Sequence, residues 1–510
     1  MSELMSAPVA DSIEVPKTSF REVFFVVAAL LIIVIGGALR VYHLGHRSLW
    51  FDEALTANSS RTTLAHMMEA QRARGSAPVV HPYILYLVEK VGKSAVAVRM
   101  PSVLASLLAI FMMLAMVRAK VSQNAALFAA AILAVSASQI RYAQEVREYS
   151  LAVLFATVLI YCLLKWEATG SRNRQPFLLY GILFLVPLVQ YGLVLLAAAV
   201  LSTVVLRLLL ADDTRFRISH LIIGSASLAA GGLLSFFLTV RYQFHPGQGQ
   251  WYLAANYFDP KTMSLFRYLG SNSKGLLSFF IPGQLVSLCF VLAAVIFCVA
   301  QARKRKFDPL TLLVFTSFAI TFCASVFKLY PYGGIRQCLF LAPGLILFAG
   351  VVIAYLLQRI KGSWQPIVSV AFLALIFFSG YRGMLRVRPY GEYEDTLSIL
   401  RELAKSSTSS DQVWVNHDAV EAVDFYLQGK DHRFVYGKYH KDPNDYIPEL
   451  FASIDPHGNR IWLVFSHLQQ RSDHYEEQLI VNSLRPSWDV QSVIAPMNTE
   501  LFVAHRRTSP

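Results

Sequence analysis

The chain is 510 residues long, and 55% of its residues are hydrophobic while only 15% are charged. A mean hydropathy of +0.46 excludes an ordinary soluble protein and indicates an integral membrane protein. The formal net charge of +13 lies mostly in short loops between apolar segments. It therefore predicts membrane topology, and we expect membrane lipids but no nucleic acid as partners.

Apolar segments long enough to cross a bilayer recur along most of the chain, since a spanning helix needs about 20 apolar residues. We expect eleven such spans, at residues 22–41, 99–117, 122–139, 148–164, 176–191, 193–210, 219–240, 277–300, 309–327, 337–357 and 364–381. The stretch 176–210 has an alternative as one long tilted helix. The expected fold is a polytopic α-helical membrane protein.

Basic residues in alternate loops predict the orientation of these spans. They are Lys17, Arg21, Arg118, Lys120, Lys165, Arg172, Arg174, Arg207, Arg215, Arg217, Arg303, Lys304, Arg305, Lys306, Arg359 and Lys361. Positive loops stay in the cytoplasm, so residues 1–21 form a cytoplasmic tail and 22–382 form the transmembrane domain. All the basic loops fall on the same side of the membrane only if residues 176–210 form two spans. The other side then receives a long first loop, 42–98, a second loop, 241–276, and the region 383–510.

The first outer loop carries an acidic pair, Asp52 and Glu53, within residues 47–53 (RSLWFDE). Ionisable residues at the membrane edge are functional candidates. Asp52 is also expected to cap a helix over 54–70, and a second amphipathic helix is expected over 83–91. Both helices would lie along the membrane surface.

The region 383–510 predicts a small α/β domain outside the cytoplasm. Helices are expected near 394–405, 419–427, 445–454 and 472–483, and strands near 412–416, 433–436, 460–466, 489–494 and 500–505. It has no glycine-rich phosphate loop, so nucleotide binding is not expected. The short loops and compact outer domain suit a bacterial inner membrane.

Four polar clusters fall on the outer side under this topology. They contain Asp52 and Glu53; His81 and Tyr83; Arg141, Gln144, Glu145 and Arg147; and Tyr332 and Arg336. Each also fits a structural role: a helix cap, a turn residue, an arginine that snorkels to headgroups or pairs with a nearby glutamate, or a tyrosine of the interfacial belt. Their coincidence favours a site.

Arginine forks match phosphate oxygens and keep their charge, and a phosphate leaving group needs its developing charge stabilised. A carboxylate within hydrogen-bond reach can take the proton of an acceptor hydroxyl. The clusters therefore predict a site that binds a lipid-linked phosphate and activates a hydroxyl, with Asp52 suited to the base.

Several segments resemble GT-C glycosyltransferases, in particular dolichyl-phosphate-mannose protein mannosyltransferases and bacterial aminoarabinose transferases of lipid A. Residues 39–44 (LRVYHL) and 48–54 (SLWFDEA) resemble the first-loop signature of these families. Residues 81–86 (HPYILY) are similar to their Pro-Pro-Leu-Tyr segment, with Tyr83 in place of the second proline. Residues 142–149 (YAQEVREY) resemble their second outer-turn motif.

The resemblance implies inverting transfer of a sugar from a polyprenyl phosphate to an acceptor on the outer face. By matching, Asp52 takes the place of the catalytic base, with Glu53 beside it, and Arg147 matches the turn arginine. His81 falls where relatives often have a lysine, which weakens phosphate binding above the histidine pKa of roughly 6.5. Arg336 is a phosphate-contact candidate by its position.

The leading hypothesis is a polyprenyl-phosphate-sugar-dependent glycosyltransferase whose acceptor is a lipid, a glycan or a protein. Arg141 or His81 would help to hold the phosphate, and Glu53, Gln144 and Glu145 would hold the sugar or a divalent cation. No ligand spacing demands a metal. One alternative is a transporter or flippase of a lipid-linked or anionic substrate. Another is a non-catalytic assembly subunit that docks through its α/β domain.

Overall fold

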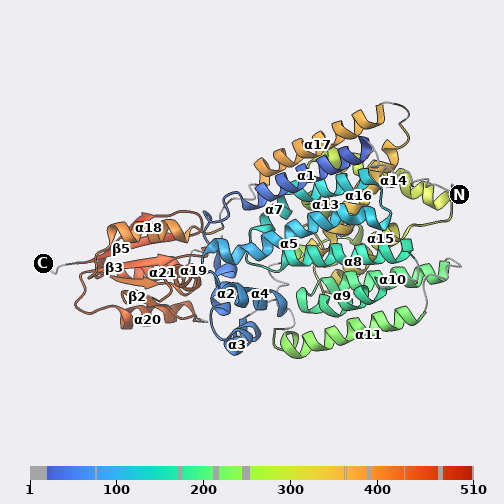
Figure 1. Cartoon of the computed structure of the whole chain (residues 1–510). Coiled ribbons are helices and arrows are strands. Elements are labelled where there is room, and N and C mark those ends of the chain that lie inside the picture. Colours follow the sequence, from blue (N-terminus) through green and yellow to red (C-terminus); the bar gives the residue numbers. More distant parts are fainter. Residues whose placement is uncertain are drawn as a thin grey trace, which may run out of the picture.

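The computed structural model describes residues 20–74, 77–169, 175–210, 218–243, 253–360, 362, 364–387, 391, 393–429, 431–440, 442–468 and 475–507. The expected cytoplasmic tail 1–21 lies almost wholly outside these residues, as do Lys17, Arg172, Arg174, Arg215, Arg217 and Lys361. Figure 1 shows a bundle of long helices with a sheet domain, coloured orange to red, at one end. Helices α2, α3 and α4 lie beside the junction of the two parts (Figure 1).

The helices of the bundle follow one another as expected for a multi-pass membrane protein. They are α1 (Phe20–Val41), α5 (Ala95–Ala115), η1 (Met116–Ala119), α6 (Gln123–Val135), α7 (Ala137–Ala143), α8 (Tyr149–Thr169), α9 (Gln175–Val189), α10 (Leu193–Leu210), α11 (Ile218–Ser235), the π-helical turn η2 (Phe236–Val240), α12 (Arg241–Gln243), η3 (Ala254–Asn256), α13 (Leu265–Phe280), α14 (Gln284–Arg303), α15 (Pro309–Val326), η4 (Arg336–Leu341), α16 (Ala342–Leu357) and α17 (Trp364–Val387). The first loop adds α2 (Phe51–Ser60), α3 (Leu64–Arg74) and α4 (Val80–Val88).

The described residues contain eight helices long and apolar enough to span a membrane, or nine if α6 and α7, bent by 61°, form one span. Two further apolar helices, 177–189 and 193–209, are shorter. The chain is thus a polytopic α-helical membrane protein, as expected. The expected count of eleven is reached only if the bent pair and both short helices cross the bilayer.

Besides the span expected at 122–139, which is bent between α6 and α7, two other expected helices differ from the structure. The helix expected over 54–70 is two helices, because the side chain of Thr63 accepts a hydrogen bond from the backbone N–H of His66 at 3.3 Å and starts α3 anew. Asp52 lies inside the first turn of α2 and does not cap it, since Trp50 is the N-cap residue. The span expected from 277 begins at Gln284, after a break at Gly283 with φ of 76°.

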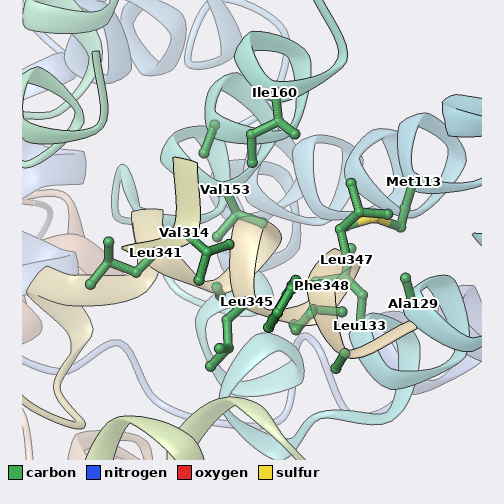
Figure 2. Close-up of a cluster of buried hydrophobic side chains, with 14 of the residues drawn as sticks. Met113, Ala129, Leu133, Val153, Ile160, Val314, Leu341, Leu345, Leu347 and Phe348 are labelled. Carbon is green, nitrogen blue, oxygen red and sulfur yellow. The ribbon is translucent and has the colours of Figure 1, made fainter. Parts of the chain in front are cut away.

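Helix α6 is enclosed by the bundle, and all its residues from Ala125 to Val135 are buried. Its alanines let neighbouring helices approach closely, as small residues do in membrane proteins. A methyl group added to Gly350 of α16 would collide with the backbone oxygen of Ala125. Figure 2 shows the surrounding core, in which Leu347 and Phe348 of α16 lie near Leu133 of α6.

The C-terminal region is a five-stranded mixed sheet in the order β2-β1-β3-β5-β4. Its elements are α18 (Thr396–Ser406), β1 (Gln412–Val415), α19 (His417–Leu427), β2 (Phe434–Tyr436), η5 (Pro443–Asp445), α20 (Tyr446–Ser453), β3 (Arg460–Phe465), α21 (Tyr475–Leu484), β4 (Trp488–Ile494) and β5 (Glu500–Arg506). Strand β1 is parallel to β2 and β3, whereas β5 is antiparallel to β3 and β4. The elements expected from the sequence are all present.

Alternate residues of each central strand enter different cores, as the two-residue period of a strand requires. Val413 and Val415 of β1 pack with α18 and α19, whereas Trp414 packs with α20 and α21. The domain is therefore a three-layer α/β sandwich.

A small apolar cluster joins this domain to the membrane bundle. Ala54 of α2, Leu85 of α4 and Val98 of α5 pack together with Phe425 of α19. Helix α2 is thus held between the bundle and the sheet domain, which fixes the position of its first turn.

Candidate active site

The first turn of α2 presents its two acidic side chains to different environments. Successive residues of a helix point about 100° apart. The side chain of Asp52 is 24% exposed, whereas Glu53 is fully buried. The acidic pair therefore contains one accessible carboxylate and one enclosed carboxylate.

Two arginines from distant segments contact the accessible carboxylate. Arg147, in the turn between α7 and α8, places Nη1 3.3 Å from Oδ2 of Asp52. Arg336, at the start of η4, donates from Nη2 to the same oxygen at 3.1 Å. Burial disfavours the charged form of Arg147, but the carboxylates of Glu148 and Asp52 raise its pKa. Both guanidinium groups therefore remain cationic at the mouth of the bundle.

Aromatic rings flank the Arg336 guanidinium. Its central carbon lies 5.1 Å from the centre of the Trp50 ring and 5.8 Å from that of Tyr149. Trp50 in turn contacts the ring of Tyr393, which precedes the sheet domain, at 5.0 Å between centroids. Cation–π contacts of this kind hold a guanidinium in one place, and here they fix it beside Asp52.

His81 lies beside the same carboxylate, in a cavity of about 50 Å³ lined by α2, α3, α4, Arg147 and Glu148. Burial, together with the nearby charge of Arg147, lowers the pKa of His81 to about 3. Its ring is therefore neutral at physiological pH. Its Nε2 atom is buried and has no hydrogen-bond partner among the described residues, so it is available to a group that enters the cavity.

Glu53 makes a buried ion pair with Arg99 of α5. The guanidinium donates to both carboxylate oxygens, at 3.0 and 2.8 Å, and the backbone N–H of Val146 donates to Oε1 at 2.9 Å. Burial alone would raise the pKa of Glu53, but these partners hold it below its ordinary value. Glu53 thereby ties α2 to α5 and to the turn that carries Arg147.

The other acidic residue of that turn, Glu145, is fully buried. Its carboxylate lies 3.4 Å from Nε of Arg141 but accepts no hydrogen bond from the described residues. Burial raises the pKa of Glu145, and the charge of Arg47 only partly opposes this. Arg141 also donates to the backbone oxygen of Gly391 at 2.6 Å and lies 3.7 Å from the centre of the Tyr393 ring. It therefore joins the bundle to the segment that leads into the sheet domain.

Three expected site residues have contacts that do not include Asp52. Gln144 donates to the backbone oxygens of Arg40 and Tyr42 at 3.0 and 2.7 Å. The hydroxyl of Tyr332 lies 2.7 Å from that of Ser273. Tyr83 is 45% exposed and stacks on Tyr86. The structure thus groups Asp52 with His81, Arg147 and Arg336, and gives these three other partners.

Sequence reasoning missed two residues that support the site. Arg99 stands at the start of an expected span, and a lone arginine in an apolar segment is the signal that marks it as a candidate. Glu394 accepts hydrogen bonds from the backbone N–H of Phe51 at 3.0 Å and from Ser466 at 3.2 Å, and lies 2.5 Å from Nδ1 of His467. No sequence pattern marks Glu394, because its partners come from both domains.

Within the described ranges, no group of three or more histidine, cysteine or acidic side chains has the geometry of a metal site. Glu53, one of the residues expected to hold a cation, already has its carboxylate occupied by Arg99 and Val146. The site therefore offers two arginine side chains that can bind an anion, and one accessible carboxylate, that of Asp52.

Part of the chain matches a known protein family. Residues 76–240 match the family model of dolichyl-phosphate-mannose-protein mannosyltransferases. No curated protein sequence matches the chain significantly.

Solved structures are similar along nearly the whole chain. The structure of ArnT from Cupriavidus metallidurans bound to undecaprenyl phosphate has a TM-score of 0.54 and 16% identity, over 94% of this chain and 97% of that one. Archaeal oligosaccharyltransferase AglB from Archaeoglobus fulgidus, in complex with an inhibitory peptide and a dolichol-phosphate, has a TM-score of 0.56 and 11% identity, over 96% of this chain and 75% of that one. The resemblance to GT-C membrane glycosyltransferases of the protein mannosyltransferase and ArnT type is thereby confirmed, through the fold of the chain and the family match over residues 76–240.

Proposed function

We propose that the protein transfers a sugar, with inversion, from a polyprenyl-phosphate-linked donor to an acceptor hydroxyl on the outer face of a bacterial inner membrane. The observation that carries this proposal is the accessible carboxylate of Asp52 between two arginines, 3.3 Å from Arg147 and 3.1 Å from Arg336. A site for a phosphate-linked donor needs both a base and fixed cations, and the three side chains supply them.

Arg147 and Arg336 are proposed to hold the carrier phosphate. Both contact the same oxygen of Asp52, and phosphate oxygens compete well with a carboxylate for the N–H groups of a guanidinium. When a phosphate engages the guanidinium groups, the carboxylate of Asp52 becomes free to accept a hydrogen bond from the acceptor. Donor binding would thus prepare the base.

The chemical step then uses Asp52 as general base. The acceptor oxygen forms a bond to the anomeric carbon while the bond from that carbon to the phosphate oxygen breaks. The electron pair of the broken bond leaves with the polyprenyl phosphate, whose developing charge the arginines stabilise. The hydroxyl proton passes to Asp52. Attack from the face opposite the phosphate inverts the anomeric centre.

The remaining candidates receive supporting roles. Glu53 positions α2 through Arg99 instead of reacting, because its oxygens are already hydrogen-bonded. Neutral His81, with its unpartnered Nε2, is proposed to hydrogen-bond a group of the substrate or a bound water in the cavity beside Asp52. Arg141 and Glu145 are proposed to shape the side of the site that faces the sheet domain. Gln144 is proposed to fix the C-terminal end of α1 through its hydrogen bond to Arg40.

The solved relatives support a lipid phosphate as the ligand. Their structures contain undecaprenyl phosphate in ArnT and a dolichol-phosphate in AglB, and both match along more than nine-tenths of this chain. The charges of the site lie at helix ends and not at the bilayer midplane, where transporters bind their substrates. This favours the transferase over the transporter alternative. The acceptor is proposed to be a lipid, a glycan or a protein reached from the sheet domain.

The test is transfer from a panel of radiolabelled polyprenyl-phosphate sugars in membranes that contain the wild type or Asp52→Asn. We expect one donor to be consumed by the wild type and not by the variant. A folded wild type that binds polyprenyl phosphate but turns over no donor, with any of the three acceptor classes present, would contradict the proposal.

A further inference from the structure

A large cavity lies at the opposite ends of the spans from Asp52. Its volume is about 1580 Å³, larger than the roughly 300–1,000 Å³ of ordinary ligand pockets. The span of Arg336–Leu357 has 22 residues; it begins at the arginine that contacts Asp52 and ends beside Tyr355 and Gln358, which line this cavity. At 1.5 Å per helical residue the span covers about 30 Å, one hydrocarbon thickness. The cavity therefore lies at the level of the headgroups of the other leaflet.

The charges that line the cavity are unbalanced. Its basic residues are Lys120, Arg207, Arg305 and Lys306, and its acidic residues are Glu167 and Asp308. Glu167 is paired with Arg207 at 2.8 Å. Asp308 caps α15, where its Oδ1 accepts a hydrogen bond from the backbone N–H of Thr311 at 3.0 Å, and its Oδ2 accepts from Gln301 and from the Thr311 hydroxyl.

Lys120, Arg305 and Lys306 have no acidic partner within the part of the chain that the structure describes. All three are exposed. Their positive charge is therefore available to an anionic group in the cavity.

The backbone at two of these cations is strained. Lys120 has φ of 63° and Arg305 has φ of 52°, in the left-handed region where glycine is the usual residue after a helix. A side chain there costs on the order of 1 kcal/mol. Strained backbone tends to persist where it serves a site, and both residues line the cavity.

The walls below the rim are apolar. Leu164, Phe297, Leu310 and Val351 line them, and they come from α8, α14, α15 and α16. A cationic rim above apolar walls at headgroup level matches a lipid better than a free anion, since basic pockets between transmembrane helices bind anionic headgroups.

We propose that this cavity binds an anionic phospholipid, with the phosphate of its headgroup on Lys120, Arg305 and Lys306 and the upper parts of its acyl chains on the apolar walls. This site lies at the other membrane surface from Asp52 and does not depend on the transfer reaction.

The test is the affinity of the purified full chain in detergent for phosphatidylglycerol, compared with phosphatidylcholine of the same acyl chains, by native mass spectrometry. The wild type should prefer phosphatidylglycerol. The combined variant Lys120→Gln, Arg305→Gln and Lys306→Gln should lose about fivefold in affinity per cation, on the order of 100-fold in all. Lys120→Arg with Arg305→Lys and Lys306→Arg should retain the preference.

A matched control removes three exposed cations elsewhere, through Lys261→Gln, Arg267→Gln and Lys274→Gln, and should bind as the wild type does. Equal affinity for both lipids, or an equal loss in this control, would overturn the proposal. Displacement of the lipid by inorganic phosphate alone would overturn it in favour of a free anion. A triple variant that loses thermal stability but keeps its lipid preference would assign the cations to the helix ends instead.

Discussion

The two faces of the first turn of α2 carry the same kind of group in opposite settings. Asp52 is 24% exposed and lies within 3.3 Å of Arg147 and 3.1 Å of Arg336. Glu53, the next residue, is fully buried against Arg99. A carboxylate can accept a proton from a substrate only where the substrate reaches it. The first turn of α2 therefore holds both the proposed base, Asp52, and a carboxylate that we expect only to position the helix, Glu53.

The largest expected effect is on Asp52. Asp52→Asn should lower the transfer rate by roughly 10²–10⁴-fold, the usual contribution of a general base. The variant should still fold, because the side chain of Asp52 is partly exposed, the amide keeps its shape, and Glu148 remains beside Arg147. Initial transfer rates and melting curves of the purified variant check this, with Asp489→Asn on exposed β4 as the control. Near-full activity of Asp52→Asn would remove this residue from the mechanism.

Glu53→Gln should act on stability first. It leaves the buried charge of Arg99 without a counter-charge, which typically costs about 3–5 kcal/mol. The double variant Glu53→Gln with Arg99→Met should recover part of this loss. Thermal unfolding in detergent measures both. A Glu53→Gln protein that is as stable as the wild type but inactive would indicate a chemical role for Glu53. It would contradict the view that Glu53 only positions α2.

The same pair predicts a pH dependence. The pKa of folded Glu53 lies below its ordinary value of 4.5. Its stabilisation is therefore fully present above about pH 4.5 and is lost as the pH falls through the lower, folded pKa. The gap in stability between the wild type and Glu53→Gln should narrow in acid. A difference in stability that widens in acid would contradict the assignment of Glu53 as the charged partner of Arg99.

Arg336→Lys and Arg147→Lys should weaken binding of the carrier phosphate. A lysine cannot form a bidentate fork, and a hydrogen bond to a charged group contributes about 1.5–3 kcal/mol, so we expect a loss of roughly tenfold to 100-fold. Arg141→Lys should have a smaller effect, because its guanidinium contacts Gly391 and Tyr393 instead. Direct binding of polyprenyl phosphate measures all three, and equal losses would contradict the proposed phosphate site.

The sequence predicts the repeated elements of this fold because each carries its own local pattern. Long apolar segments predict the spans, and short apolar runs predict β1 and β3. Local patterns fail where the chain breaks, as at Gly283, and where distant segments meet. The pairing of Glu53 with Arg99 depends on how α2 packs on α5, and the contacts of Glu394 depend on two domains, so neither is visible in the sequence. The motif predicts both Asp52 and Glu53 as site candidates, and only the packing shows that one carboxylate is accessible and the other buried.

The smallest expected effect lies in the sheet domain, away from the reaction. Burial opposes the charge of His417, but Asp418 and Glu476 raise its pKa to about 9. Its ion pairs therefore stabilise the folded state fully below about pH 6.5, and this stabilisation is lost as the pH rises through 9. His417→Gln should cost about 1 kcal/mol or less, since the partners are partly exposed. Melting curves across this pH range check it, and a cost that grows toward alkaline pH would contradict the assignment.

In this account Asp52 acts as the base, and Arg147 and Arg336 bind the carrier phosphate. The most direct test of this division of roles is the affinity of Asp52→Asn for polyprenyl phosphate. Removing the carboxylate frees Arg147 and Arg336 for the phosphate and removes a repulsive charge. The account therefore predicts affinity equal to or tighter than that of the wild type, together with loss of transfer. A variant whose affinity falls as far as its transfer rate would show that Asp52 serves carrier binding, and would contradict its assignment as the base.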